Sequence, residues 1–311
     1  MGTTARIDRS RLPAPTPPHR FAFPRIDKSA IASGLTVWTV PHTAIPAVTF
    51  ALLFKRGSAD DPAGHEGLAA ITVDMLDEGS GDRSAIAIHE ALASIGAHLD
   101  SDIGADASLL GTTVLARFAG PALALLADIV ARPSLTAEDF ARVRQLRLNR
   151  LRQIRDMPGA LADRAFARLL YGTHPYGHTP LGTESTLTAL DIDAVKSFHA
   201  SVLRPAEATL VAVGDCDHAT IVKLASEAFA GWEGAASQPL PVAAATPRGS
   251  RLAIVPRTGA PQSELRMGHI AVDRRTPDYH ALVAANMVLG GQFVSRLNLN
   301  LRENKGITYG A

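Results

Sequence analysis

The chain has 311 residues, 46% hydrophobic and 20% charged, which is typical of a globular protein with one large domain or two ordinary ones. Its 31 basic and 30 acidic residues leave a formal net charge of +1, which argues against a nucleic acid or an anionic membrane as partner. The single cysteine, Cys216, excludes an internal disulfide, and no stretch approaches the roughly 18 apolar residues of a membrane span.

The first 25 residues predict an extended arm, because they are rich in proline and arginine and contain no long apolar run. A secretory signal needs an apolar run, so the sequence predicts a cytoplasmic protein.

Hydrophobic patterns predict alternating strands and helices after the arm. Apolar side chains at every second position favour strands over residues 35–40 and 46–54. Spacings of three and four residues favour a helix over residues 67–76. The elements predicted next are helices over 85–95, 119–131, 136–155, 159–170, 191–202 and 218–229, a hairpin pair over 98–102 and 107–116, and a strand over 208–213.

The composition changes near residue 235. Residues 236–249, rich in Ala, Ser and Pro, predict a linker. Strands are then predicted over 251–255 and 264–272 and a helix over 278–289, an order that repeats the strand, strand and helix of the first domain.

The predicted fold class is therefore α+β, with an antiparallel sheet packed against helices. The arm covers residues 1–25, the first domain 26–235, and a partial second copy 250–311. The chain ends at Ala311, soon after the predicted start of a strand, and a domain rarely stops at such a point. We therefore expect a fragment or a truncated gene.

Several short motifs follow one another between residues 31 and 311. They include Gly67-Leu68-Ala69 with Met75-Leu76, Asp156-Met157-Pro158, His174-Pro175-Tyr176-Gly177, Val211 to Asp215, Gly290-Gly291 and Gly306-Ile307-Thr308-Tyr309. Each is weak alone, but their order and spacing resemble the pitrilysin/insulinase family of zinc peptidases, which includes the mitochondrial processing peptidases. The resemblance implies paired domains that enclose a clam-like chamber.

The family binds zinc through an inverted H-x-x-E-H motif on a helix, in which the two histidines hold the metal and the glutamate activates water. A glutamate from a later long helix completes the site. The corresponding positions here are Ala70, Val73, Asp74 and Arg150. Alanine and valine have no donor atoms, and arginine brings a positive charge to the place of a cation. The resemblance thus implies no zinc site and no cofactor in this chain. We further predict that Asp74 pairs with Arg150 in place of the metal.

Arg302 and Tyr309 match the arginine and tyrosine with which the family holds the substrate backbone and stabilises the tetrahedral intermediate. Some family members divide the work, so that one chain carries zinc and the other carries this pair. The resemblance therefore implies a non-catalytic subunit that binds peptide and lends Arg302 and Tyr309 to a zinc-bearing partner of the same family, in a homo- or heterodimer.

Two alternatives remain open. One is a structural or chaperone-like peptide-binding protein, in which Arg302 and Tyr309 are ordinary surface residues. The other is an active zinc peptidase with relocated ligands. A zinc-peptidase gene beside this one would favour the divided enzyme over the chaperone.

Other candidate residues have simpler interpretations. His174 and His178 are four apart, but Pro175 and Gly177 between them predict a loop rather than a helical ligand pair. Cys216 has no histidine partner in the sequence and is interpreted as a small hydrophobic residue. Glu66 before the helix over 67–76 and Asp77 and Glu78 after it are interpreted as exposed helix-end charges, with a makeshift carboxylate site for Mg or Ca as the alternative. The arginines of the helix over 136–155 predict a solvated face or a wall facing an acidic partner.

Overall fold

The computed structural model describes residues 10, 16–17, 21–235, 242, 244–246 and 249–310. The chain folds as two compact units, the first made of residues 1–157 and 178–242 and the second of residues 158–177 and 243–311. The predicted arm over 1–25 and the predicted linker over 236–249 lie largely outside the described residues. No helix in the described part of the chain is long and apolar enough to cross a membrane.

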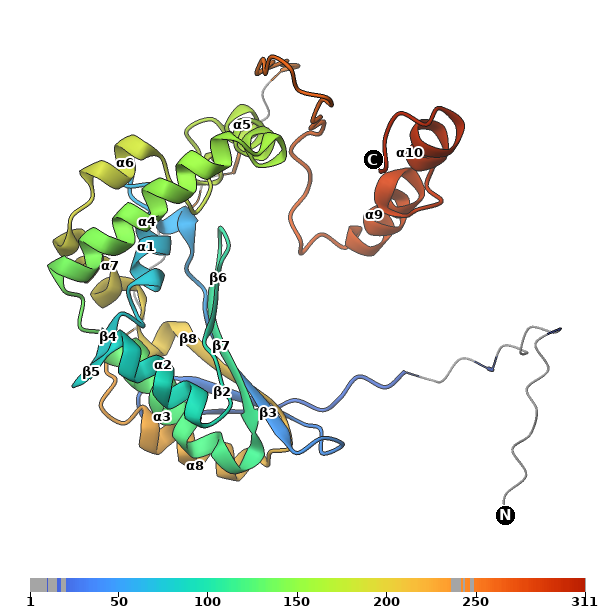
Figure 1. Ribbon diagram of the computed structural model, residues 1–311. Coiled ribbons are helices and arrows are strands. Elements are labelled where there is room, and N and C mark those ends of the chain that lie inside the picture. The colour runs from blue at the N-terminus through green and yellow to red at the C-terminus, as the bar shows by residue number, and fades with distance from the viewer. Residues whose placement is uncertain are drawn as a thin grey trace. The chain divides into compact units, whose positions relative to one another are not determined.

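A six-stranded sheet forms the centre of the first unit, with strands in the order β1-β2-β8-β3-β7-β6 (Figure 1). The strands are β1 (Asp27–Ala30), β2 (Thr36–Pro41), β3 (Ala47–Phe54), β6 (Asp100–Ile103), β7 (Ser108–Leu115) and β8 (Ala208–Gly214). Neighbouring strands are antiparallel except β2 and β8, which are parallel. The short strands β4 (Gly79–Ser80) and β5 (Arg83–Ser84) form a separate ribbon.

The two faces of the sheet differ in character. In β3, Phe50, Leu52 and Phe54 are fully buried, whereas the alternating Ala51 and Leu53 are only half-buried. We call the first the covered face and the second the open face. The alternation is that of a sheet with helices packed on one side, as the sequence pattern predicted.

The helices of the first unit confirm the predicted order. They are α1 (Leu68–Asp74), α2 (Ala85–Ser94), α3 (Ala119–Ala131), α4 (Ala137–Arg155), α6 (Glu184–Ala189), α7 (Ile192–Val202) and α8 (His218–Ala228). Side chains of Ser84, Thr136 and Asp217 cap three of them by accepting hydrogen bonds from backbone amides. Short α6, strand β1 and the β4-β5 ribbon were not predicted, because such brief segments carry no clear periodicity.

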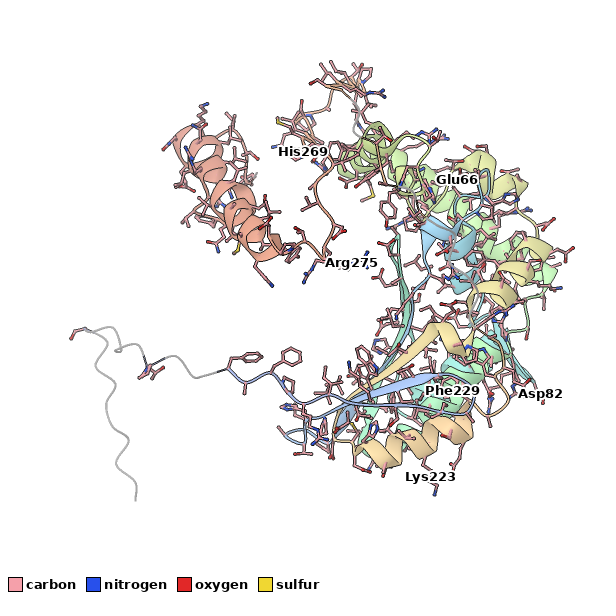
Figure 2. The ribbon with its side chains drawn as sticks, turned by 180° about the vertical axis from the view of Figure 1, so that it is seen from behind. Glu66, Asp82, Lys223, Phe229, His269 and Arg275 are labelled. Carbon is pink, nitrogen blue, oxygen red and sulfur yellow. The ribbon has the colours of Figure 1, made fainter. Side chains whose placement is uncertain are left out.

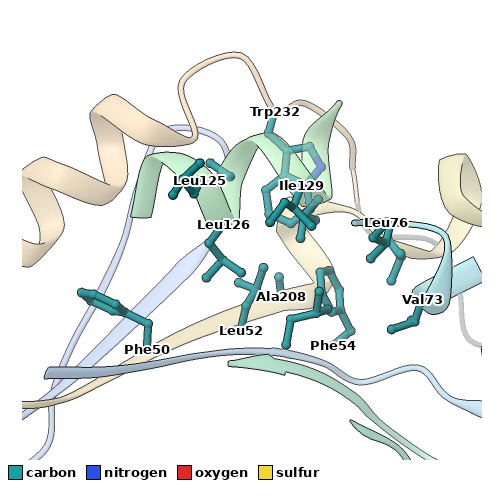
Figure 3. Close-up of a cluster of buried hydrophobic side chains, with 14 of the residues drawn as sticks. Phe50, Leu52, Phe54, Val73, Leu76, Leu125, Leu126, Ile129, Ala208 and Trp232 are labelled. Atoms are coloured by element: carbon teal, nitrogen blue, oxygen red, sulfur yellow. The ribbon is translucent and has the colours of Figure 1, made fainter. Parts of the chain in front are cut away.

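The core lies between the covered face and the helices (Figure 3). Leu126 and Ile129 of α3 lie over Phe50, Leu52 and Phe54 in the close-up, with Trp232 beside them. The rings of Phe54 and Trp232 meet edge to face at 6.0 Å. Figure 2 shows Lys223 on the outer side of α8, where its side chain is 77% exposed. Burial of these large side chains, at about 1.5–3 kcal/mol each, is the main stabilisation of the unit.

The second unit contains α5 (Pro158–Tyr171), α9 (Tyr279–Asn286) and the short α10 (Arg296–Asn298), with π-helical segments at Met287–Gly291 and Leu299–Asn304. Arg266 anchors its irregular part to α5, because Nε donates to Asp163 at 2.5 Å and Nη2 donates to the Gly159 carbonyl at 3.3 Å.

The strands predicted over 251–255 and 264–272 are wrong, since neither segment pairs with another strand. An alternating pattern stabilises a strand only when a neighbour accepts its backbone hydrogen bonds, and none is supplied among the described residues. The predicted helix over 278–289 is confirmed as α9 and the π-helical turn after it.

Candidate functional site: a degenerate zinc helix and an open sheet edge

The start of α1 is held in place by a buried carboxylate. Both oxygens of Asp61 accept backbone hydrogen bonds, from Gly67 and from Ala69, each at 2.7 Å. Gly67 itself has φ +102°, a conformation that favours glycine, and a Cβ there would lie 3.2 Å from Gly182. These contacts fix the position of the helix that carries Ala70, Val73 and Asp74, the residues that the sequence comparison placed at the family's zinc motif.

The loop after residue 177 packs against the same helix start. Gly182 has φ +71°, and a Cβ on it would meet the Glu66 carbonyl oxygen at 2.2 Å, so only glycine fits. The Thr186 hydroxyl donates to that same carbonyl at 2.7 Å. Glu66, labelled in Figure 2, precedes the N-cap Gly67 of α1 in the chain.

Two of the four positions that the resemblance matches to the zinc site are buried and have no side-chain donor atom. Ala70 and Val73 are each 4% exposed. Val73 belongs to the hydrophobic core and lies beside Leu76 in the close-up (Figure 3). Neither the first histidine position nor the base position of the motif therefore presents a group that could touch a metal or a water.

Asp74, at the second histidine position, is engaged by an arginine of α4. Arg147 donates Nη1 to the Asp74 carboxylate and Nη2 to the Pro180 carbonyl at 3.0 Å. The Arg147 side chain is 11% exposed, and its hydrogen bonds join α4 to α1 and to the loop that contains Pro180. The prediction that Asp74 pairs with Arg150 is wrong, because the rotation of α4 directs the arginine one turn earlier toward α1 and leaves Arg150 exposed.

These positions do not fit a zinc ion. Two lack donors, the third holds a carboxylate already paired with a cation, and the fourth carries an exposed arginine. Within the described ranges, no three His, Cys, Asp or Glu side chains gather as metal ligands.

The acids after α1 are paired individually. Glu78 accepts a hydrogen bond from Arg142, and Asp77 lies 3.4 Å from Nε2 of His89. Burial raises the pKa of the Asp77 carboxyl above its usual value. Asp77 and Glu78 are half-buried rather than exposed as predicted, and their pairing with protein side chains favours structural charges over a carboxylate metal site.

His178 is a loop residue, as predicted, with a defined contact. Its Nε2 lies 2.9 Å from the Ser58 carbonyl and 3.2 Å from the Asp61 carboxylate. Burial alone would lower the pKa of His178, but the hydrogen bond and charge of Asp61 outweigh it and raise that pKa above its usual value. The residue thus fastens the loop to the carboxylate that holds α1.

Other sequence candidates are structural. Burial and the charges of Asp215 and Asp217 raise the pKa of the Cys216 thiol, which opposes a nucleophilic role. Several arginines of α4 make contacts within the first unit: Arg144 donates to the Leu190 carbonyl and Arg155 to Glu184, besides Arg142 and Arg147. The arginine-bearing face of α4 therefore partly holds neighbouring segments of the same unit together.

Arg302 and Tyr309 lie in the second unit, on either side of a helix end. Gly306, with φ +62°, closes the helix by donating to the Arg302 carbonyl at 3.0 Å. The Arg302 guanidinium lies 4.1 Å from the centre of the Phe293 ring and 3.4 Å from Glu303, and its side chain is 34% exposed. Tyr309 is 87% exposed.

The hairpin of β6 and β7 leaves one edge of the sheet open (Figure 1). β6 pairs with β7 on one side, and no described strand pairs with it on the other. Helix α1 contacts β6, so part of this edge strand lies beside α1. An open edge of this kind can accept an extended peptide as a further strand.

Sequence reasoning missed Arg147 and Asp61. The sequence analysis paired Asp74 with Arg150, but the rotation of α4 decides which arginine faces α1. Asp61 precedes Pro62 in a loop, where only the folded structure reveals that its carboxylate caps α1.

Two family models cover most of the chain. Residues 37–184 match the insulinase family, peptidase family M16, and residues 189–311 match the peptidase M16 inactive domain. The chain belongs to this family of metallopeptidases, the insulinase or pitrilysin family, as the motifs indicated.

The chain is also similar in sequence to proteins named as zinc proteases. An uncharacterized zinc protease of Rickettsia bellii is 29% identical over 65% of this chain and 49% of its own, and one of Mycobacterium tuberculosis is 28% identical over 95% of this chain and 68% of its own. A probable mitochondrial-processing peptidase subunit beta of Schizosaccharomyces pombe is 23% identical over 86% of this chain and 60% of its own. The chain thus spans about half to two-thirds of the length of these relatives.

Solved structures agree on the fold. A peptidase M16 inactive domain from Pseudomonas fluorescens has a TM-score of 0.80 and 26% identity, covering 92% of this chain and 69% of its own. A protease from Helicobacter pylori has a TM-score of 0.78 and 18% identity, covering 92% of this chain and 70% of its own, a likeness that concerns the fold alone.

Proposed function

We propose that this chain is the non-catalytic member of a two-chain peptidase. It binds extended peptide and contributes Arg302 and Tyr309 to the site of a zinc-bearing partner of the same family. The observation that carries the proposal is the arrangement on α1. Ala70 and Val73 offer no metal ligand, and the Asp74 carboxylate is paired with Arg147.

Peptide binding is assigned to the outer edge of β6, by strand addition. The edge is open and runs beside α1, so a peptide held there would pass the degenerate zinc motif. Main-chain hydrogen bonds would supply affinity without requiring one sequence.

The contribution to the partner's active site comes from residues 250–311, which we take as part of a second family domain. A guanidinium and a phenol hydroxyl are suitable donors to an oxyanion that develops during peptide hydrolysis. The exposure of Tyr309 supports its availability to another chain.

The test is reconstitution with a zinc-bearing family member from the same organism. The chain alone is expected to have no peptidase activity, and its addition should raise the kcat of the partner. Tyr309→Phe and Arg302→Lys should reduce that gain by roughly tenfold to a thousandfold without changing the zinc content of the complex. Zinc-dependent cleavage by the purified chain alone would refute the proposal.

A structural or chaperone-like peptide binder is the second candidate. It is favoured by the contacts of Arg302, whose guanidinium is already engaged by Phe293 and Glu303 of its own chain. In that case Arg302→Lys and Tyr309→Phe would leave every partner activity unchanged while peptide binding persists.

An active enzyme with relocated ligands is the third candidate. Metal analysis after zinc reconstitution tests this candidate. About one equivalent of bound zinc per chain would support an active enzyme, and well under a tenth of an equivalent would exclude one. A cytoplasmic location remains a prediction from the sequence.

A further inference from the structure

The outward-facing backbone of β6 can be identified from the hairpin. Gly104 donates its N–H to the Ala107 carbonyl at 2.9 Å, and Asp102 lies opposite Leu109 in the same register. Because backbone groups alternate in direction along an antiparallel strand, those of Asp102 point toward β7. The N–H and C=O groups of Ser101 and Ile103 therefore point toward the open side.

One end of this edge is closed by the chain itself. The 3-10 helix Ser58–Asp60 begins there, and the amides of Ser58 and Ala59 donate to the carbonyls of Gly104 and Ala105 at 3.0 and 2.9 Å. The free stretch is thus short, which limits an added strand to a few residues with a defined register.

Two acidic side chains border the free stretch. Asp100 and Asp102 lie opposite Gly111 and Leu109, which in turn lie opposite Ala51 and Leu53, so both carboxylates stand on the open face. Both residues are exposed, and Asp106 in the following turn is exposed as well.

Basic groups near the edge do not cancel these charges. Nε2 of His98 lies 3.1 Å from Asp100, but both side chains are well exposed, at 73% and 67%. Lys55 follows β3, so β7 separates it from the edge by about 10 Å, or two strand spacings. A peptide on the outer side of β6 would lie directly beside Asp100 and Asp102 instead.

We propose that the outer edge of β6 selects extended peptides with basic residues at alternate positions. This rests on the proposed peptide-binding function and adds the substrate class. Directly opposite side chains on paired strands have Cβ atoms about 4.5–5.5 Å apart, and opposite charges there are favourable. Alternate residues of an added strand share one face, so two bases spaced by one residue meet Asp100 and Asp102 together.

The test measures binding of labelled peptides by fluorescence anisotropy. One peptide alternates Lys with Val, a second has Glu in place of each Lys, and a third has Thr at those positions. The Lys peptide should bind about three- to tenfold more tightly than the Thr peptide. The advantage should shrink between about 50 mM and about 500 mM salt, because exposed charges are screened.

Variants assign the effect to the two carboxylates. Asp100→Asn with Asp102→Asn should remove the preference for Lys and leave binding of the Thr peptide unchanged. The matched control, Glu90→Gln with Asp193→Asn, removes the same charge from exposed positions on α2 and α7 and should keep the preference. Equal affinity for the Lys and Glu peptides, or equal behaviour of both double variants, would overturn the inference.

A backbone variant separates this inference from the proposed function. Ser101→Pro removes one outward N–H at an edge position, where proline is tolerated, and should weaken all three peptides alike. If Ser101→Pro weakens binding but charge has no effect, only the selectivity for bases falls. If no peptide binds the wild-type chain, the peptide-binding function and the selectivity fall together.

Discussion

The two units of the chain differ in how far they bury their apolar side chains. In the first, a continuous cluster from Ile31 to Trp232 is buried between sheet and helices. In the second, the buried residues among 249–310 are the polar Ser295 and Asn298, while Leu265 and Met267 are 79% and 95% exposed.

The difference shows that hydrophobic pattern and strand formation are separable. Apolar side chains alternate over residues 46–54 and over 264–268, but only the first segment has β7 and β8 on its two sides. A strand satisfies its backbone through its neighbours, and a segment without them gains little from the pattern alone.

Hydrogen exchange is expected to show the largest contrast. Amides of β3 and β8 should exchange only through global unfolding, whereas those of residues 251–272 should exchange through local opening. The rates are expected to differ by roughly a thousandfold or more. Mass-spectrometric exchange of the intact chain measures this, and equal protection in the two regions would contradict the comparison.

Truncation of an apolar side chain should separate the units next. Phe54→Ala removes a fully buried ring and should lower the free energy of unfolding by about 3–5 kcal/mol. Leu265→Ala, at an exposed position, should change it by about 0.5 kcal/mol or less. Urea denaturation followed by circular dichroism measures both, and similar losses would mean that residue 265 is buried in solution.

The ion pair between Asp74 and Arg147 gives a smaller effect inside the first unit. Arg147→Met removes the charged hydrogen bonds to Asp74 and Pro180 and should lower the free energy of unfolding by about 1–3 kcal/mol. The control, Arg150→Met on the same helix, should change it by about 0.5 kcal/mol or less. A double-mutant cycle with Asp74→Asn isolates the pair, and the absence of coupling would argue against the contact.

The smallest effect is a pH dependence at the start of α1. The pKa of His178 is raised in the folded chain, so its stabilisation is fully present below the unfolded pKa of about 6.5 and is lost as pH rises through the folded value. Unfolding free energies between about pH 5.5 and 8.5 should therefore fall less steeply in His178→Gln than in the wild type. Parallel pH profiles in the two proteins would exclude this role of His178.

Much of the first unit was predictable because its elements are long and periodic. The strands over 46–54 and 208–213 and the helices over 119–131 and 136–155 were confirmed within a few residues. The strands predicted over 251–255 and 264–272 were wrong, since the sequence of a segment does not state whether a neighbouring strand is present.

In the candidate site, too, some properties follow from the sequence and others only from the tertiary structure. Ala70 and Val73 lack donor atoms in any conformation, so their failure to bind zinc follows from residue type alone. The pairing of Asp74 depended on the rotation of α4, and the predicted Arg150 was wrong by one helical turn.

The sequence by itself determined the family and the order of the elements in the first unit, because these depend on residue identity and local periodicity. Only the tertiary structure decided which arginine meets Asp74, which carboxylate holds α1 and which strand lies at the open edge. These depend on contacts between residues far apart in the chain, such as Asp74 with Arg147 and Asp61 with His178, and such contacts leave no local pattern.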